Sequence, residues 1–135
     1  MKTIWIPALV TVIVVSLLLP GSAVNAEFSN KGVVHTVFLW LKQSGNEQHR
    51  RQIMLATDRL RAIPGVLDIR YGEAIASCRA IVDDSFDVGI YFYFRDVAAM
   101  NRYLVDPVHE RVVEQDIRPI VERIVIHDFH DAVLR

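Results

Sequence analysis

Two segments of this chain have the composition of β-strands that are buried on both sides. Residues 33–42 and 86–95 are rich in β-branched and aromatic side chains. Side chains alternate across a strand, so the two faces can be compared. Both faces are largely apolar: in the first segment Val37 and Leu39 share one face, and Phe38 lies on the other. Such strands need cover on both sides of their sheet.

The remaining elements alternate with these strands in a regular order. Asn46 and Asp96 are suitable helix N-caps, and apolar side chains recur at helical spacing after each of them. We expect Arg118-Pro119 to kink or restart the last helical part toward Glu122. The predicted strands are 33–42, 66–75, 86–95 and 123–129, and the predicted helices are 47–63, 97–104 and 107 to about 115. This order predicts a single α+β domain of the ferredoxin-like βαβ-βαβ class, with a four-stranded antiparallel sheet and helices on one face.

The second face of that sheet is too apolar to remain bare. It would expose phenylalanine, tyrosine and tryptophan side chains over a large area, and such patches mark interaction surfaces. Two sheets packed face to face about a two-fold axis would cover both patches at once. We therefore expect the chain to be its own partner, as a homodimer through the sheet face.

Residues 1–26 have the pattern of a secretory signal peptide. Lys2 is a short basic region, and a nearly continuous apolar run follows over residues 4–19. Small side chains just before residue 27 predict cleavage after Ala26. The apolar run is also shorter than the roughly 20 residues that a membrane-spanning helix needs. We expect a mature domain of residues 27–135, periplasmic or secreted and free of the membrane; the alternative is an uncleaved anchor.

Charge and ligand patterns exclude several kinds of partner. The chain has 15 basic and 16 acidic residues, which gives no reason to expect a nucleic acid partner. Neither Asp83-Asp84 in a loop nor His127 and His130 on the last strand supply enough converging ligands for a metal ion. We expect no metal and no cofactor. The single cysteine, Cys78, is expected to be an unpaired structural thiol, with an intersubunit disulfide as the alternative.

Residues 103–109 (Tyr-Leu-Val-Asp-Pro-Val-His) have the pattern of a helix end, a tight break and a new helix start. Asp106 is suited to the N-cap and Pro107 to the first helical position. His109 then falls in the first turn, where the helix dipole disfavours an imidazolium. We expect a neutral imidazole that can act as a base. Tyr103 lies one turn upstream and can approach the same pocket.

This segment is one of five short motifs that, in their order and spacing, resemble the stress-responsive A/B barrel family (Dabb, dimeric α/β barrel domains). The resemblance covers roughly residues 33–130 and implies a homodimer whose two sheets form a barrel. The chain departs from the commonest family motif at Asp106, where histidine is usual. The other four motifs are His35 to Lys42, Ile63-Pro64-Gly65-Val66, Asp84 to Gly89 and His127-Asp128-Phe129.

The resemblance also implies a site. In the plant polyketide-cyclase branch of the family, a tyrosine and a histidine of the same motif perform acid–base chemistry, and a histidine at the start of the first strand borders the pocket. Those positions are Tyr103, His109 and His35 here. We expect the rest of the pocket wall to be apolar, which favours an apolar or aromatic ligand. The wall residues we expect are Val37, Leu39, Ile53, Ala56, Leu60 and Ile90.

Three functions from different classes remain. The first is an exported homodimer that binds a small apolar or aromatic molecule without clear catalysis. The second is a cyclase, isomerase or lyase in which His109 is the base and Tyr103 the hydrogen-bond donor, a contribution of about 10² to 10⁴ in rate. The third is a non-catalytic interaction module in which both side chains only tie the helix break to the sheet. An open pocket lined by His109 favours the first two.

The leader gives the first testable prediction. Mass spectrometry of the exported protein should show a chain that begins at Glu27, because the cleavage pattern ends at Ala26. A chain of full length that sediments with the membrane fraction would instead establish an N-terminal anchor.

Overall fold

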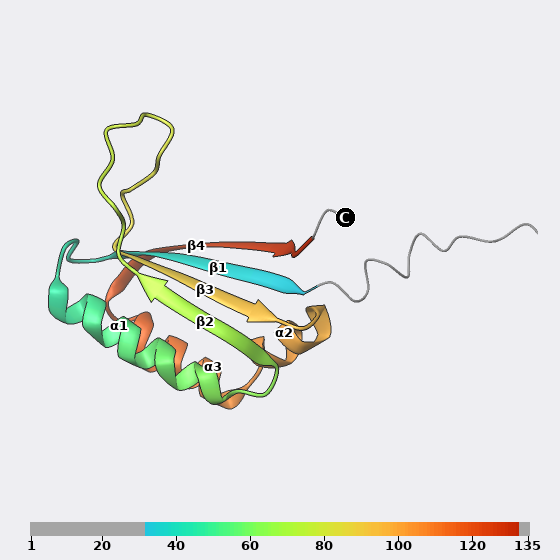
Figure 1. Cartoon of the computed structure of the whole chain (residues 1–135). Helices are drawn as coiled ribbons and strands as arrows, with labels where there is room; N and C mark the ends of the chain where they lie inside the picture. The colour runs from blue at the N-terminus through green and yellow to red at the C-terminus, as the bar shows by residue number, and fades with distance from the viewer. Residues whose placement is uncertain (1–31, 133–135) are drawn as a thin grey trace, which may run out of the picture.

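The chain forms a four-stranded antiparallel sheet with helices against it (Figure 1). The computed structural model describes residues 32–132, so the predicted leader and its cleavage site lie outside the described residues. Within 32–132, no helix combines the length and apolar character needed to cross a membrane. The elements are β1 (Val33–Leu41), α1 (Glu47–Arg59), the 3-10 turn η2 (Leu60–Ala62), β2 (Val66–Gly72), β3 (Val88–Phe94), α2 (Val97–Leu104), α3 (Pro107–Val112), the π-helical turn η3 (Val113–Ile117) and β4 (Val121–His130).

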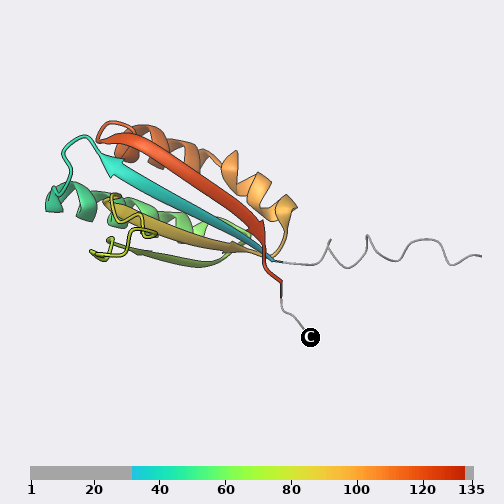
Figure 2. The same ribbon diagram turned by 90° about the horizontal axis from the view of Figure 1, so that it is seen from above.

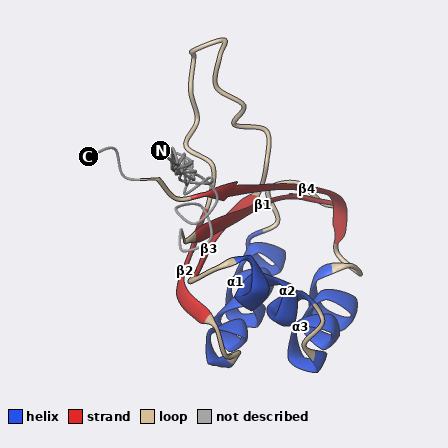
Figure 3. Ribbon diagram, turned by 90° about the vertical axis from the view of Figure 1, so that its right-hand side faces the viewer, coloured by secondary structure: helices blue, strands red, loops and turns tan. Residues whose placement is uncertain are grey.

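The strand order is β2-β3-β1-β4, and every neighbouring pair is antiparallel. This confirms the predicted ferredoxin-like α+β class. The helices of residues 32–132 lie on one side of the sheet, and the long loop between β2 and β3 rises on the other side (Figures 1 and 3). Figure 2 shows the same strands and helices from above. The sheet therefore has a helix face and an open face.

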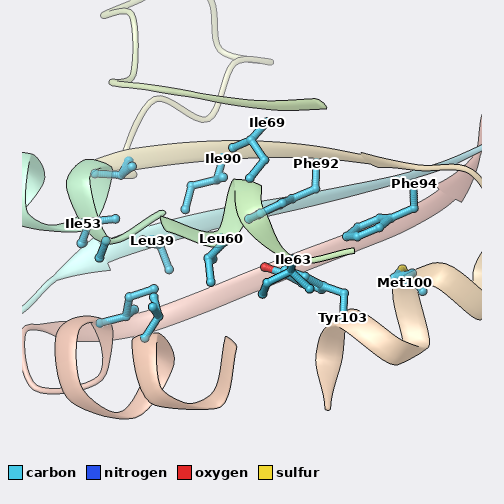
Figure 4. Packing of buried hydrophobic residues seen from close by; sticks show 14 of the residues in the cluster. Leu39, Ile53, Leu60, Ile63, Ile69, Ile90, Phe92, Phe94, Met100 and Tyr103 are labelled. Atoms are coloured by element: carbon cyan, nitrogen blue, oxygen red, sulfur yellow. The ribbon is translucent and has the colours of Figure 1, made fainter. Parts of the chain in front are cut away.

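The helix face holds the hydrophobic core. Leu39, Ile53 and Phe94 have no exposed surface, and Tyr103 is 1% exposed. Aromatic rings of β3 and α2 meet in the middle of this layer (Figure 4), with the ring centroids of Phe94 and Tyr103 5.0 Å apart. The inward side chains of β1 and β3 are those that the alternating pattern assigns to one face.

The open face carries the other half of the same strands. Thr36 pairs with Tyr91, and Phe38 pairs with Gly89. The guanidinium carbon of Arg123 lies 4.2 Å from the centre of the Trp40 ring, a cation–π contact on the same face. Within residues 32–132, no helix lies on this side of the sheet (Figure 3). The need for a second layer therefore persists in the folded chain.

One strand departs from simple alternation. The register of β2 against β3 shifts between Val66 and Asp68, which leaves Leu67 as a bulge. As a result Val66 and Ile69 both pack toward the core, while Leu67 is 60% exposed. Simple alternation along residues 66–75 would place Leu67 and Ile69 on one face; the bulge inserts one residue into the alternation and separates them.

Several boundaries also differ from expectation. β2 ends at Gly72, because Gly72–Gly89 is its last pair with β3. β3 begins at Val88, the residue that forms the last pair with β1, opposite Leu39. Pro119 does not restart a helix: residues 118–120 form a turn, and β4 follows directly. Asn46 and Asp96 cap α1 and α2 as predicted, accepting hydrogen bonds from the N–H groups of His49 and Ala99.

Asp87, just before β3, holds the end of β1 to the start of α1. Its carboxylate is 6% exposed and accepts hydrogen bonds from the Leu41 N–H at 2.8 Å, the Gly45 N–H at 2.7 Å and the Ser44 hydroxyl at 3.2 Å. Gly45 has φ of 78°, a conformation that side chains disfavour. One buried carboxylate thus satisfies the groups of a tight turn.

Replacing Asp87 with alanine should lower the free energy of unfolding by about 2–4 kcal/mol, because one buried and two partly buried hydrogen bonds lose their acceptor. Asp58→Ala is the matched control, since Asp58 makes only an exposed ion pair with Arg61; it should change stability by less than about 0.5 kcal/mol. Urea unfolding measures both. An equal loss of unfolding free energy in the two variants would show that the Asp87 hydrogen bonds contribute no more to stability than an exposed ion pair.

Candidate functional site

A cavity of about 160 Å³ lies between the helix face of the sheet and the helices. Strands β1, β3 and β4 form one wall, and α1, η2, α2, α3 and η3 contribute the other. Its lining is mostly aliphatic and aromatic, with a few polar groups. The lining residues are His35, Val37, Leu39, Thr57, Leu60, Ile90, Phe92, Tyr103, Leu104, His109, Val113, Ile117, Ile124 and Ile126.

The structure brings most of the predicted site residues together around this cavity. His35, Tyr103 and His109 all line it, and so do Val37, Leu39, Leu60 and Ile90. Ile53 and Ala56 do not line it, which corrects our expectation for these two. Ile53 is fully buried in the core, and Ala56 borders an open depression on the outer side of α1. The cavity meets the C-terminal end of α1, one turn beyond Ile53.

Sequence reasoning missed several lining residues. Phe92 follows Ile90 on the same face of β3, and Ile124 and Ile126 lie on the inward face of β4. The alternating pattern could have identified these three. Thr57 is fully buried on α1. It lies four residues after Ile53, so helical spacing could also have placed it on the buried face of this helix. Val113 and Ile117 of η3 could not be placed, because the packing of η3 depends on the turn at Asp106.

Tyr103 supplies a neutral phenol to the cavity wall. Its side chain packs on the rings of Phe92, Phe94 and His109, with centroid distances of 5.3, 5.0 and 4.5 Å. Burial raises the pKa of the Tyr103 hydroxyl well above its ordinary value of 10. The hydroxyl therefore stays protonated at physiological pH and can donate a hydrogen bond.

His109 is a half-buried imidazole with one nitrogen already engaged. Its Nδ1 lies 3.0 Å from the carbonyl oxygen of Leu104. A carbonyl only accepts, so Nδ1 carries the proton, and the neutral ring leaves Nε2 as an acceptor. Burial lowers the pKa of His109 below 6.5; the hydrogen bond to Leu104 opposes this effect, and the nearby His35 adds to it. The low pKa agrees with the predicted neutral base.

The cause differs from the one we expected. Asp106 does cap α3, accepting a hydrogen bond from the Val108 N–H at 2.8 Å. However, α3 has only six residues, and desolvation is the first cause of the His109 shift. The helix dipole is therefore not needed to explain the neutral imidazole.

A second imidazole is held by a carboxylate. His35 Nδ1 lies 2.6 Å from Asp128 Oδ1, and the two residues stand opposite each other in the β1–β4 register. His35 is 3% exposed, whereas the Asp128 side chain is 42% exposed. The carboxylate accepts a hydrogen bond from Nδ1–H, which fixes the ring orientation and leaves Nε2 available to the cavity. Asp128 was not predicted as a site residue, because cross-strand register is not visible in the sequence.

Together, these groups equip an apolar cavity for proton transfer or polar recognition. The rings of His35 and Tyr103 lie 6.3 Å apart, and those of Tyr103 and His109 lie 4.5 Å apart. A ligand group between them would meet a phenol donor and two imidazoles in different environments. Within the part of the chain that the structure describes, no group of three potential ligands could hold a metal ion.

Comparison with known proteins identifies the family. Residues 33–131 match the Stress responsive A/B Barrel Domain (Dabb). This chain belongs to the Dabb family. The match spans nearly all of the described residues, so the five motifs, the fold and the cavity all fall within one Dabb domain. None of the curated proteins matches the chain.

Several solved structures share the fold. A Dabb family protein with a ferredoxin-like fold from Mesorhizobium loti is 25% identical, with a TM-score of 0.63, over 76% of this chain and 99% of that chain. A dimeric ferredoxin-like protein of unknown function from Thermobifida fusca is 19% identical, with a TM-score of 0.61, over 76% and 93%. Hydroxynitrile lyase from Passiflora edulis is 20% identical, with a TM-score of 0.67, over 78% and 98%.

The lowered pKa of His109 predicts a pH-dependent contribution to stability. The unfolded chain takes up this proton near pH 6.5, and the folded chain only at lower pH. As the pH falls below about 6.5, protonation of His109 therefore favours the unfolded state. The free energy of unfolding decreases until the pH has passed below the pKa of His109 in the folded state. The stability advantage of the wild type over His109→Gln should shrink between about pH 7.5 and 4.5 in urea unfolding.

His130→Gln, at the exposed end of β4, controls for the loss of an imidazole elsewhere. A constant difference between wild type and His109→Gln across this range would mean that burial does not perturb His109.

Proposed function

We propose that this Dabb protein is an exported homodimer that binds a small apolar or aromatic molecule in the cavity beside Tyr103 and His109. The observation that carries the proposal is the cavity itself: about 160 Å³, walled mainly by aliphatic and aromatic side chains, with a few polar groups at one place. Ligand sites commonly combine an apolar wall with a few placed polar groups. A domain that served only to dimerise would have no need of this space.

The volume limits the ligand to about one ring. An engineered apolar cavity of about 150 Å³ in another protein stays dry and binds benzene. A molecule of that size with one hydroxyl or carbonyl group matches both the volume and the polar side chains. Larger polycyclic ligands would require the helices to move away from the sheet.

Two further parts of the proposal rest on other observations. Several structural neighbours are described as dimeric, and the open face of the sheet carries the aromatic side chains that a second copy would cover. Export rests on the pattern of residues 1–26.

Toluene and phenol are suitable probes for binding. Both should shift the methyl resonances of the cavity isoleucines in NMR titrations, since Ile124 and Ile126 line the cavity. Val113→Phe should abolish the shifts, because Val113 lines the cavity and the larger ring fills it. Val105→Phe is the control, since Val105 is 69% exposed. If neither toluene nor phenol shifts these resonances, the binding proposal is contradicted and a non-catalytic interaction module is favoured.

The polar groups favour a second candidate function, a lyase. His109, Tyr103 and the His35–Asp128 pair offer bases and a donor around one ligand, and one structural neighbour is a hydroxynitrile lyase. In such a reaction an imidazole Nε2 would take the hydroxyl proton of a cyanohydrin. The carbon–carbon bond then breaks, the oxygen becomes a carbonyl, and cyanide leaves and receives the proton.

Mandelonitrile, a cyanohydrin with a single ring, tests this function. Release of benzaldehyde followed by absorbance should be catalysed by the wild type and should fall about 10²- to 10⁴-fold in His109→Ala. Toluene binding by the same variant should change little, which separates lost chemistry from lost folding. A wild type with no activity on mandelonitrile, yet with normal probe binding, would leave the binding function alone in place.

A further inference from the structure

The loop between β2 and β3, residues 73–87, exposes two large apolar side chains. Ile75 is 87% exposed and Ile81 is 92% exposed, the highest values among the exposed large hydrophobic residues of the described chain. The loop rises from the open side of the sheet, away from the helices (Figures 1 and 3). We call residues 73–87 the arm.

The arm has internal structure of its own. The Ser77 N–H donates to the Asp84 carboxylate at 2.7 Å and so ties the two limbs of the arm together. The Val82 N–H donates to the Arg79 carbonyl at 3.0 Å and closes the tip. The limbs enclose an open hollow of about 380 Å³. The arm is therefore hydrogen-bonded to itself and yet does not bury its isoleucines.

The base of the arm is continuous with the open face of the sheet. The Phe86 ring packs against Phe38 and Trp40, with centroid distances of 4.9 and 6.3 Å. The Trp40 indole N–H donates to the Ser85 hydroxyl at 2.9 Å. The aromatic surface that a second sheet would cover thus extends without a break into the arm.

The length of the arm fits a second copy of the chain. Its 15 residues run out and back, so each limb of about seven residues spans roughly 20 Å or a little more when extended. Packed sheets lie only about 10 Å apart. If two open faces met, each arm would extend past the sheet of the other subunit.

We propose that the arm clasps the second subunit of the homodimer and buries Ile75 and Ile81 against it. The inference rests on the proposed dimer through the sheet face. Two-fold symmetry makes the contact reciprocal, so four isoleucine side chains leave water when one dimer forms. This explains why a hydrogen-bonded loop leaves both of its isoleucine side chains exposed in the single chain.

The dimer dissociation constant tests the proposal. The full chain is expressed, purified as the cell processes it, and studied by sedimentation. Ile75→Ser/Ile81→Ser should weaken dimerisation about 100-fold or more, because burial of each isoleucine favours association. Leu55→Ser/Val105→Ser is the matched control: both residues are exposed, at 61% and 69%, and lie on the helical side. It should change the constant less than about three-fold.

Cys78 provides a second readout that does not depend on the dissociation constant. It is a free, exposed thiol between the two isoleucines. Alkylation by N-ethylmaleimide should slow several-fold as the wild type dimerises with rising concentration. In the arm double variant, dimer formation should protect this thiol much less.

The outcomes separate failure of the arm from failure of the dimer. A wild type that remains monomeric at all concentrations overturns both. The wild type could instead form a dimer whose dissociation constant and Cys78 reactivity do not change with the arm substitutions. That result would contradict the proposed contact of the arm and would leave the proposed dimer intact. Vesicles of zwitterionic and anionic phospholipid test the other occupant: if the arm substitutions abolish vesicle binding but not dimerisation, the arm contacts a membrane and the clasp is wrong.

Discussion

The burial of β1 on both of its faces is the constraint on which the rest of the structure depends. β1 lies between β3 and β4 in the interior of the sheet, and its inward residues Val33 and Leu39 are almost completely buried. Its other face carries Phe38 and Trp40. The helices of the same chain cover the face that carries Val33 and Leu39. Within residues 32–132 no helix lies against the second face, and the proposed dimer and arm both follow from that imbalance.

The same strand also positions the chemistry. The pairing of β1 with β4 sets His35 opposite Asp128, and the pairing with β3 sets it opposite Phe92. A one-residue slip would turn His35 to the open face and break its contact with the carboxylate. The site thus depends on strand register, and the core packing around Leu39 is what holds that register.

Asp106 illustrates how a departure from the family pattern can preserve structure. The position before Pro107 must cap α3, and a cap needs an acceptor for a free backbone N–H. The Asp106 carboxylate meets this need by accepting from Val108. The turn then directs His109 back toward Tyr103, so the cavity keeps its imidazole although the usual histidine is absent one turn earlier.

The sequence by itself determined the fold class, the helix caps and half of the residues that line the cavity. Apolar periodicity and capping chemistry are local, and they identify which face of each element is buried. The tertiary structure alone decided the bulge at Leu67, the partnership of His35 with Asp128, and the exclusion of Ile53 and Ala56 from the cavity. These features depend on how residues far apart in the chain are aligned and on where two layers fail to fill space. Neither alignment nor empty volume is a property of any local stretch of sequence.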